Sequence, residues 1–174
     1  MAGKKEIEVK LLYKNKDKII ERLRPGIKLL GKTEVFDKYY GAAKDGIKNK
    51  NHFIRIRKIN GEIELTYKGK AENKRNIISR KELTVKISAV GPAEKILYSL
   101  GYQKISDHQS KREFWSFDGA EIVFSEFTKP AHLRFMEIEA NSDNRIKEIL
   151  KKISGCVSKV GEDIFSKFDR KGTT

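Results

Sequence analysis

Charged side chains that could bind a metal or a phosphate recur two positions apart along this chain. Glu6, Glu8 and Lys10 form the first set. Residues two apart in an extended strand point to the same side, so each set would gather its charges on one strand face. Carboxylate oxygens bind hard divalent cations, and ammonium and guanidinium groups bind phosphate. The further sets are Arg55/Arg57, Glu62 or Glu64 with Lys68, Arg80/Glu82 with Lys86, and Glu137/Glu139.

The positions between these charges are largely aliphatic, as at Ile7, Val9 and Leu11. Two architectures explain the alternation. In an open sheet or sandwich, the charged face meets solvent and the apolar face forms the core. In a closed antiparallel barrel, the charged faces line a polar interior and helices cover the apolar outside. Arginine at Arg55 and Arg57 favours the barrel, because its fixed fork of donors suits carboxylate or phosphate better than water.

Alternation, helical spacing and turn residues predict the elements that must position these charges. Asn60-Gly61 and Asp118-Gly119 are typical of two-residue hairpin turns. The expected strands are 6–12, 33–40, 53–59, 63–68, 78–88, 103–107 with 111–117 as one bent strand, 121–127 and 132–140. The expected helices are 17–23, 91–100 and 142–153, with one more helical turn at 161–167.

The order of these elements predicts how the chain is organised. Each half reads strand, helix and three strands, over about residues 5–70 and 77–140, and C-terminal helices follow over 142–170. No linker rich in Pro, Gly or Ser separates the halves, so we expect them to share one sheet. The prediction is a single α+β domain over residues 1–174.

Composition limits the class of protein. Lys and Arg outnumber Asp and Glu by 38 to 24, a formal net charge of +14, which favours an anionic partner such as nucleic acid, an anionic membrane or a small polyanion. The hydrophobic fraction of 38% is enough for a core. Cys156 is the single cysteine, so a reduced, cytoplasmic protein is expected. The N-terminal residues lack an apolar stretch that could serve as a signal peptide or membrane span, so no membrane partner is expected.

A series of motifs occurs in order over about residues 5–140. They are Glu6-Ile7-Glu8-Val9-Lys10, Asp37-Lys38-Tyr39-Tyr40, Arg55-Ile56-Arg57, Leu65-Thr66-Tyr67-Lys68-Gly69, Arg80-Lys81-Glu82, Leu100-Gly101-Tyr102, Arg112 with Trp115, and Phe135-Met136-Glu137-Ile138-Glu139. In order and spacing the series resembles the CYTH superfamily, the triphosphate tunnel metalloenzymes that include class IV adenylate cyclases and thiamine triphosphatases.

The resemblance implies an eight-stranded antiparallel β-barrel tunnel with helices packed outside. It implies that Mg²⁺ or Mn²⁺ is bound by Glu6, Glu8, Glu137 and Glu139. It implies that a triphosphate is held by Lys10, Arg55, Arg57, Lys68, Arg80 and Arg112. The residues that it implies as catalytic are Lys10, Arg55, Arg57 and Glu82. Asp37 is expected to fix a strand end, and Tyr39 to pack or to form a hydrogen bond with a neighbour.

The chain departs from the family pattern at two tunnel positions. Ser110 stands where the family usually carries lysine, so one phosphate contact is expected to be lost. Counting forward from Arg112 places Ser125 where the family usually carries an aspartate ligand. The neighbouring Glu126 could replace that ligand if a β-bulge shifts the register.

Three functions remain open from the sequence. The first is metal-dependent phosphohydrolysis of a nucleoside, thiamine or inorganic triphosphate, and the second is cyclisation of ATP to cyclic AMP and pyrophosphate. The third is a non-catalytic module that binds polyphosphate or nucleic acid, which would have no use for carboxylates on its anion-binding face. A homodimer is also left open. His52, His108 and His132 are expected at the surface or in turns, and Phe114 in core or hairpin packing.

Overall fold

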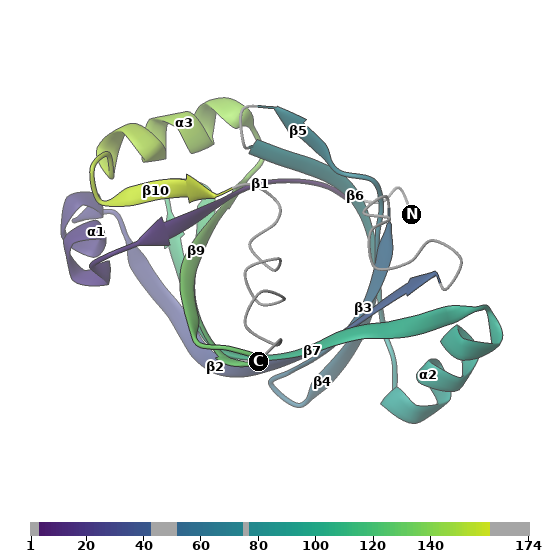
Figure 1. Ribbon diagram of the computed structural model, residues 1–174. Coiled ribbons are helices and arrows are strands. Elements are labelled where there is room, and N and C mark those ends of the chain that lie inside the picture. The colour runs from purple at the N-terminus through teal and green to yellow at the C-terminus, as the bar shows by residue number, and fades with distance from the viewer. Residues whose placement is uncertain (1–3, 43–51, 75–76, 161–174) are drawn as a thin grey trace, which may run out of the picture.

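The computed structural model describes residues 4–42, 52–74 and 77–160, and their side chains over 7–42, 52–74 and 77–158 (Figure 1). Eight antiparallel strands close into a barrel in the order β1-β9-β8-β7-β2-β3-β4-β6, and β6 pairs again with β1. These strands are β1 (Lys4–Tyr13), β2 (Lys28–Ala42), β3 (Phe53–Ile59), β4 (Glu62–Lys68), β6 (Ile77–Lys86), β7 (Tyr102–Phe117), β8 (Ala120–Lys129) and β9 (Leu133–Ala140).

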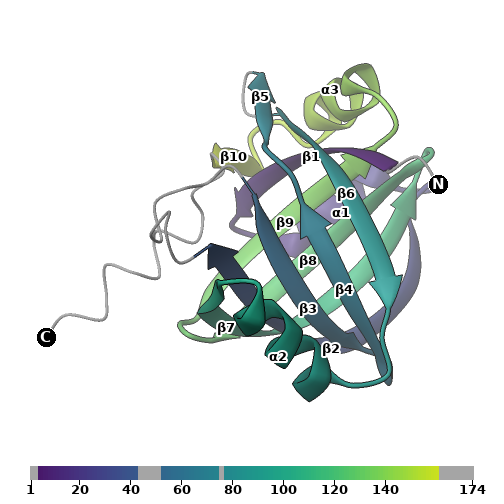
Figure 2. The same cartoon turned by 90° about the vertical axis from the view of Figure 1, so that its right-hand side faces the viewer.

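Two short strands extend the sheet beside the barrel. β5 (Glu72–Lys74) pairs with β6, and β10 (Val157–Val160) pairs with β1. Figure 2 shows β3, β4 and β6 in front, with β1, β8 and β9 forming the wall behind them. The interior therefore lies between two walls built from different parts of the chain.

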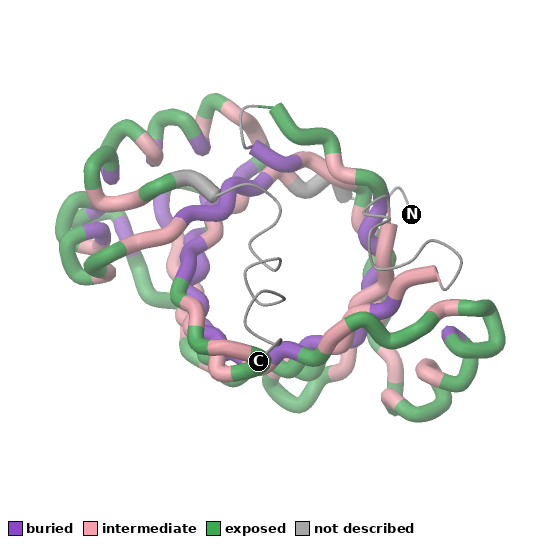
Figure 3. The backbone as a smooth tube through the Cα atoms, viewed as in Figure 1, coloured by how far each residue is buried: buried purple, intermediate pink, exposed green. Residues whose placement is uncertain are grey.

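Three helices lie outside the barrel (Figure 1). They are α1 (Lys16–Leu23), α2 (Val90–Ser99) and α3 (Asp143–Lys152). Asn15 caps α1 by accepting from the Lys18 N–H, and Ser142 caps α3 by accepting from the Arg145 N–H. Each helix covers part of the apolar outer wall, and Figure 3 shows buried segments of the helices where they face the barrel.

Most of the hydrophobic core lies between the helices and the outside of the barrel, and a smaller buried pair, Phe127 and Phe135, lies on the inner wall. Beneath α1 and α3, Ile19, Leu23, Ile146 and Ile149 pack in one buried cluster with Val9, Leu11, Ile122, Met136 and Ile138 of the strands. Beneath α2, Leu97 packs with Tyr40 and Ile56. The apolar strand faces thus point outward and the charged faces inward. The closed barrel is confirmed, and the open sheet with a solvated charged face is wrong.

The hairpin turns and the bent strand agree with the sequence prediction. Asn60 and Gly61 have φ of 50° and 79°, and Asp118 and Gly119 have φ of 49° and 73°, as the expected two-residue turn requires. Strand β7 is continuous through residues 108–110, as expected for one strand, with an irregularity in its pairing with β8 between Gln109 and Ser110. β5 and β10 were not predicted, and the helical turn expected at 161–167 lies outside the described residues. Within the described ranges, no helix is long and apolar enough to cross a membrane.

Candidate active site inside the barrel

The barrel interior contains a cavity of about 170 Å³. Its lining comes from β1, β2, β3, β4, β6, β7, β8 and β9, because residues of one parity on each strand face inward. Most of the basic and acidic residues singled out in the sequence lie here. The lining residues are Glu8, Lys10, Tyr39, Phe53, Arg55, Arg57, Lys68, Arg80, Arg112, Phe114, Glu121, Val123, Phe135, Glu137 and Glu139.

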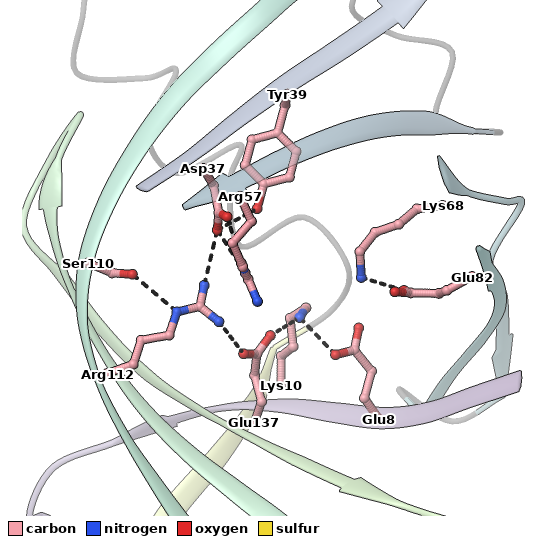
Figure 4. Close-up of polar contacts among 10 residues, drawn as sticks. All are labelled: Glu8, Lys10, Asp37, Tyr39, Arg57, Lys68, Glu82, Ser110, Arg112 and Glu137. Carbon is pink, nitrogen blue, oxygen red and sulfur yellow. Dashed lines mark hydrogen bonds and ion pairs between the residues drawn. The ribbon is translucent and has the colours of Figure 1, made fainter. Parts of the chain in front are cut away.

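Lys10 links two carboxylates at the centre of the site (Figure 4). Its Nζ donates to Glu8 Oε2 at 3.2 Å and forms a short hydrogen bond with Glu137 Oε1. Burial raises the pKa of the Glu137 carboxyl, but the charges of Lys10 and Arg112 outweigh burial and lower that pKa to about 2. The same carboxylates more than offset the burial of Lys10 and hold its pKa above the usual range. Both Glu137 and Lys10 are therefore charged at neutral pH.

Asp37 joins this group from the opposite wall. Arg57 donates Nε to Asp37 Oδ1 at 2.7 Å and Nη2 to Oδ2 at 2.8 Å, which is a two-pronged ion pair. Arg112 Nη2 lies 3.4 Å from Asp37 Oδ2, and its Nη1 lies 3.6 Å from Glu137 Oε2. Burial alone would raise the pKa of Asp37, but the hydrogen bonds and charge of Arg57 hold it well below the usual range.

The prediction that Asp37 fixes a strand end is wrong. Asp37 lies in the middle of β2, is 2% exposed, and connects β2 to arginines on β3 and β7. Together, Glu8, Lys10, Glu137, Arg112, Asp37 and Arg57 form a continuous chain of alternating charges around the interior (Figure 4). Three of these groups are acidic and three basic, so the chain of charges is balanced.

Arg55 and Arg80 are cations outside that balanced chain. The Nε atom of each is buried and has no hydrogen-bond partner within the described part of the protein. The Arg80 guanidinium lies 5.4 Å from the centre of the Phe53 ring. A buried donor without an acceptor is costly, so these two nitrogens mark a place that suits an anion.

Lys68 and Glu82 form a further ion pair on the β4–β6 side of the cavity (Figure 4). Lys68 is buried, and the register places it directly opposite Glu82. Glu6 lies opposite Arg80 in the β1–β6 register, but its side chain is outside the described atoms.

The condition on which Glu126 could replace the aspartate ligand, a bulge that turns it inward, is not met, so its place among the metal ligands is wrong. The register sets Arg112 opposite Ser125 and Lys111 opposite Glu126, so Ser125 faces the interior and Glu126 the outside. Glu126 accepts from Arg134 Nη2 at 2.9 Å on the outer surface. Ser125 is 0% exposed, and its hydroxyl has no partner among the described residues. The carboxylate that β8 does bring to the cavity is Glu121, which the sequence analysis missed.

Aromatic rings continue the inner wall beside the charges. His108 is buried, with its ring 4.9 Å from that of Tyr39 and 5.7 Å from that of Phe127. The Phe127 ring stacks on Phe135 at 5.2 Å. The prediction of a surface or turn position for His108 is therefore wrong. Phe114 lies opposite Val123 in the β7–β8 hairpin, and both residues line the cavity. His108 and Phe114 share strand parity with Arg112, which is the signal that could have placed them inside.

A comparison with known families supports what the geometry suggests. The CYTH domain matches residues 4–170, which is nearly the whole chain. The chain belongs to the CYTH family.

One sequence relative of this CYTH protein has a cyclase name, and the description of one structure with the same fold mentions both a cyclase and a triphosphatase activity. A Methanocaldococcus jannaschii protein, MJ0240, whose name proposes an adenylate cyclase, is 27% identical over 117 residues, which cover 67% of this chain and 66% of that protein. The solved structure of PH1819 from Pyrococcus horikoshii has a TM-score of 0.71 at 25% identity, covering 92% of this chain and 99% of that one. The Hippeastrum protein HpAC1, described as a candidate adenylyl cyclase with a dominant triphosphatase activity, has the same fold with a TM-score of 0.71, at 14% identity and 97% coverage of both chains.

The donors in the CYTH barrel suit a hard divalent cation by their chemistry. Glu8, Glu137 and Glu139 all offer carboxylate oxygens to one cavity. Among the residues whose positions are described, no three Asp, Glu, His or Cys side chains converge on one point that could hold a metal ion. Because Lys10 lies between Glu8 and Glu137, a cation held by this pair would require the ammonium to move.

Proposed function

We propose that this CYTH protein is an enzyme that binds a small molecule carrying a triphosphate inside its barrel and hydrolyses it with the help of Mg²⁺ or Mn²⁺. The observation that carries the proposal is the pair of buried Nε atoms of Arg55 and Arg80, which have no hydrogen-bond partner among the described residues and lie in a cavity that also contains carboxylates. A module that binds anions alone would gain nothing from those carboxylates, because they repel phosphate unless a cation lies between them.

Each basic residue would bind a different part of the triphosphate. Arg55 and Arg80 each have a buried Nε donor with no partner in the described ranges, so they would donate to phosphate oxygens first. Arg57 and Arg112 would take others with the nitrogens that Asp37 leaves available. Lys68 would bind from β4, with Glu82 setting the position of its ammonium. Phosphoryl transfer depends chiefly on such positioning and charge neutralisation.

The carboxylates would hold the divalent cation. Glu8, Glu137 and Glu139 are the described candidates, with Glu6 added from the family resemblance. Such a cation neutralises phosphate charge and lowers the pKa of a bound water. Lys10 would pass from its carboxylates to a phosphate oxygen, since its ammonium lies between the acidic and basic parts of the site.

Cyclisation of ATP is the second candidate, supported by the name of the Methanocaldococcus jannaschii relative. In that reaction a ribose hydroxyl attacks the innermost phosphorus and pyrophosphate leaves. The same cations and carboxylates would serve it. The two reactions differ in their products, so a product analysis separates them.

The test is to incubate the purified protein with tripolyphosphate, ATP or thiamine triphosphate, each with Mg²⁺ or Mn²⁺. Orthophosphate, pyrophosphate and cyclic AMP are then resolved. We expect orthophosphate release that Glu137→Gln and Arg55→Gln abolish. Lys86→Gln, on an exposed side chain that pairs with Glu62, is the matched control and should retain the activity. Cyclic AMP with pyrophosphate would make the protein a cyclase.

Two further results would overturn the catalytic proposal. One is a lack of product with every substrate and metal. The other is nucleic-acid binding that needs no divalent cation and weakens steeply with salt, as phosphate-backbone contacts do.

A further inference from the structure

Asp37 occupies an unusual place in a site that is proposed to bind a polyanion. It is a buried carboxylate surrounded by the guanidinium groups of Arg57 and Arg112, and the charge of Arg55 also acts on it. A negative charge at this point weakens the attraction of the neighbouring cations for phosphate. Its presence therefore calls for a role other than adding charge to the site.

Asp37 fixes the orientation of the Arg57 guanidinium through two hydrogen bonds. The two carboxylate oxygens accept hydrogen bonds from Nε and Nη2 of Arg57. Figure 4 shows the remaining end of that guanidinium directed toward the middle of the cavity. A two-pronged pair fixes the plane of the guanidinium as well as its distance. A phosphate would then meet an arginine whose orientation is already set.

The second arginine is held from two sides. Arg112 Nη2 lies 3.4 Å from Asp37 Oδ2, and Arg112 Nε donates to Ser110 Oγ at 3.1 Å. Arg57 belongs to β3 and Arg112 to β7, and these strands flank β2, which carries Asp37. One carboxylate thus ties together cations from two strands that do not pair with each other.

We propose that Asp37 is a positioning residue that holds Arg57 and Arg112 as a fixed pair, and that this pair selects a triphosphate chain over shorter phosphate anions. The inference rests on the proposed function, because it concerns the same site. Asp37 holds both guanidinium groups on its own side of the cavity, and Arg55, Arg80 and Lys68 line the same cavity. A triphosphate chain can therefore reach the fixed pair and these further cations together. A shorter anion reaches fewer of them, whereas freely moving arginines would close around either one.

The positioning itself can be tested without a ligand. The arginine Nε–Hε signals of Arg57 and Arg112 would be followed by NMR in the wild type, in Asp37→Asn, and in Asp107→Asn. Asp107 is a matched control because it lies on the outer face of β7 in an exposed pair with Lys104. We expect a rigid, slowly exchanging Arg57 signal in the wild type and Asp107→Asn, and a mobile one in Asp37→Asn. A rigid Arg57 in Asp37→Asn would overturn the positioning role.

Selectivity is tested by calorimetric binding of tripolyphosphate and of pyrophosphate to the same proteins. We expect Asp37→Asn to bind tripolyphosphate about tenfold more weakly, with a smaller change for pyrophosphate, as the loss of a charge-assisted contact allows. If Asp37 acts only through its charge, Asp37→Asn binds both anions more tightly, and the proposal fails. Equal affinities in variant and wild type would also overturn it.

A second variant covers the case in which Asp37→Asn does not fold. Arg57→Lys keeps the positive charge but lacks the two adjacent N–H donors that bind Asp37. It should therefore lose the same preference for tripolyphosphate. A preserved preference in Arg57→Lys would contradict the inference. If the wild type binds neither anion, the proposed function and the selectivity both fail, while the NMR experiment still decides whether Asp37 orients Arg57.

Discussion

Ser110 Oγ accepts a hydrogen bond from Arg112 Nε at 3.1 Å inside the barrel. In the family that the sequence resembles, this position usually carries a lysine. The serine is buried and contacts the arginine, so its side chain supports a cation where the family would place one. At a position where the resemblance implies a phosphate-binding lysine, this chain therefore has a serine that contacts Arg112.

Ser110→Ala should weaken the binding of tripolyphosphate by about fivefold, because a typical hydrogen bond contributes about 1 kcal/mol. Arg112 would keep its contact with Asp37 but lose the one to the serine hydroxyl. Calorimetric titration of the variant measures this directly. Ser116→Ala, farther along the same strand, is the control, and equal affinities in all three proteins would show that Ser110 has no supporting role.

Glu137→Gln should make the protein less sensitive to acid. The pKa of Glu137 is lowered to about 2 in the folded state, so this carboxylate stabilises the fold above its ordinary pKa. The stabilisation, on the order of 3 kcal/mol, is lost as the pH falls from about 4.5 toward 2. Denaturant unfolding at several pH values should give a flatter profile for Glu137→Gln than for the wild type. Identical profiles would contradict the assigned pKa direction.

Glu126→Gln should leave activity and metal dependence unchanged. Its carboxylate pairs with Arg134 on the exposed outer surface, where an ion pair contributes about 0–1 kcal/mol of stability. Activity assayed across a range of Mg²⁺ or Mn²⁺ concentrations tests this, with Glu139→Gln as the inward-facing comparison. A raised metal requirement in Glu126→Gln would mean that the outer placement of this residue is incorrect.

Ile146→Ala should lower the free energy of unfolding by about 2–4 kcal/mol, because it leaves a cavity in the fully buried core beneath α3. Thermal or denaturant unfolding measures the loss. The folded fraction should still bind tripolyphosphate with wild-type affinity, since Ile146 lies outside the barrel. Reduced affinity in fully folded protein would show that the outer core also shapes the interior.

The inward faces could be predicted from the sequence because strand parity is a local property. Glu8 and Lys10, like Arg55 and Arg57, are two residues apart and so share a face whatever the strands pair with. Parity alone could not predict the closure of the barrel, because an open sheet with a solvated charged face shows the same alternation. Arg55 and Arg57 favoured a barrel, and the resemblance to the CYTH superfamily implied its eight strands.

The role of Asp37 could not be predicted in this way. Its partners Arg57 and Arg112 are 20 and 75 residues away along the chain, so the contact depends on tertiary pairing. The error at Glu126 has a related cause. A shift of one residue in register moves a side chain to the other face of the sheet. The irregularity in the β7–β8 pairing lies between Gln109 and Ser110, so it leaves the pairing of Arg112 with Ser125 unchanged. The short strand β10 likewise depends on its pairing with β1.

Most of the apolar core of this protein lies on the outside of the barrel, beneath α1, α2 and α3. Much of the apolar packing that supports the barrel wall is thus separated in space from the charged side chains that face the cavity. A change such as the serine at position 110 or 125 can alter what the cavity binds while the packing that supports the wall stays intact. A scaffold of this kind can change the side chains of its cavity without changing its architecture.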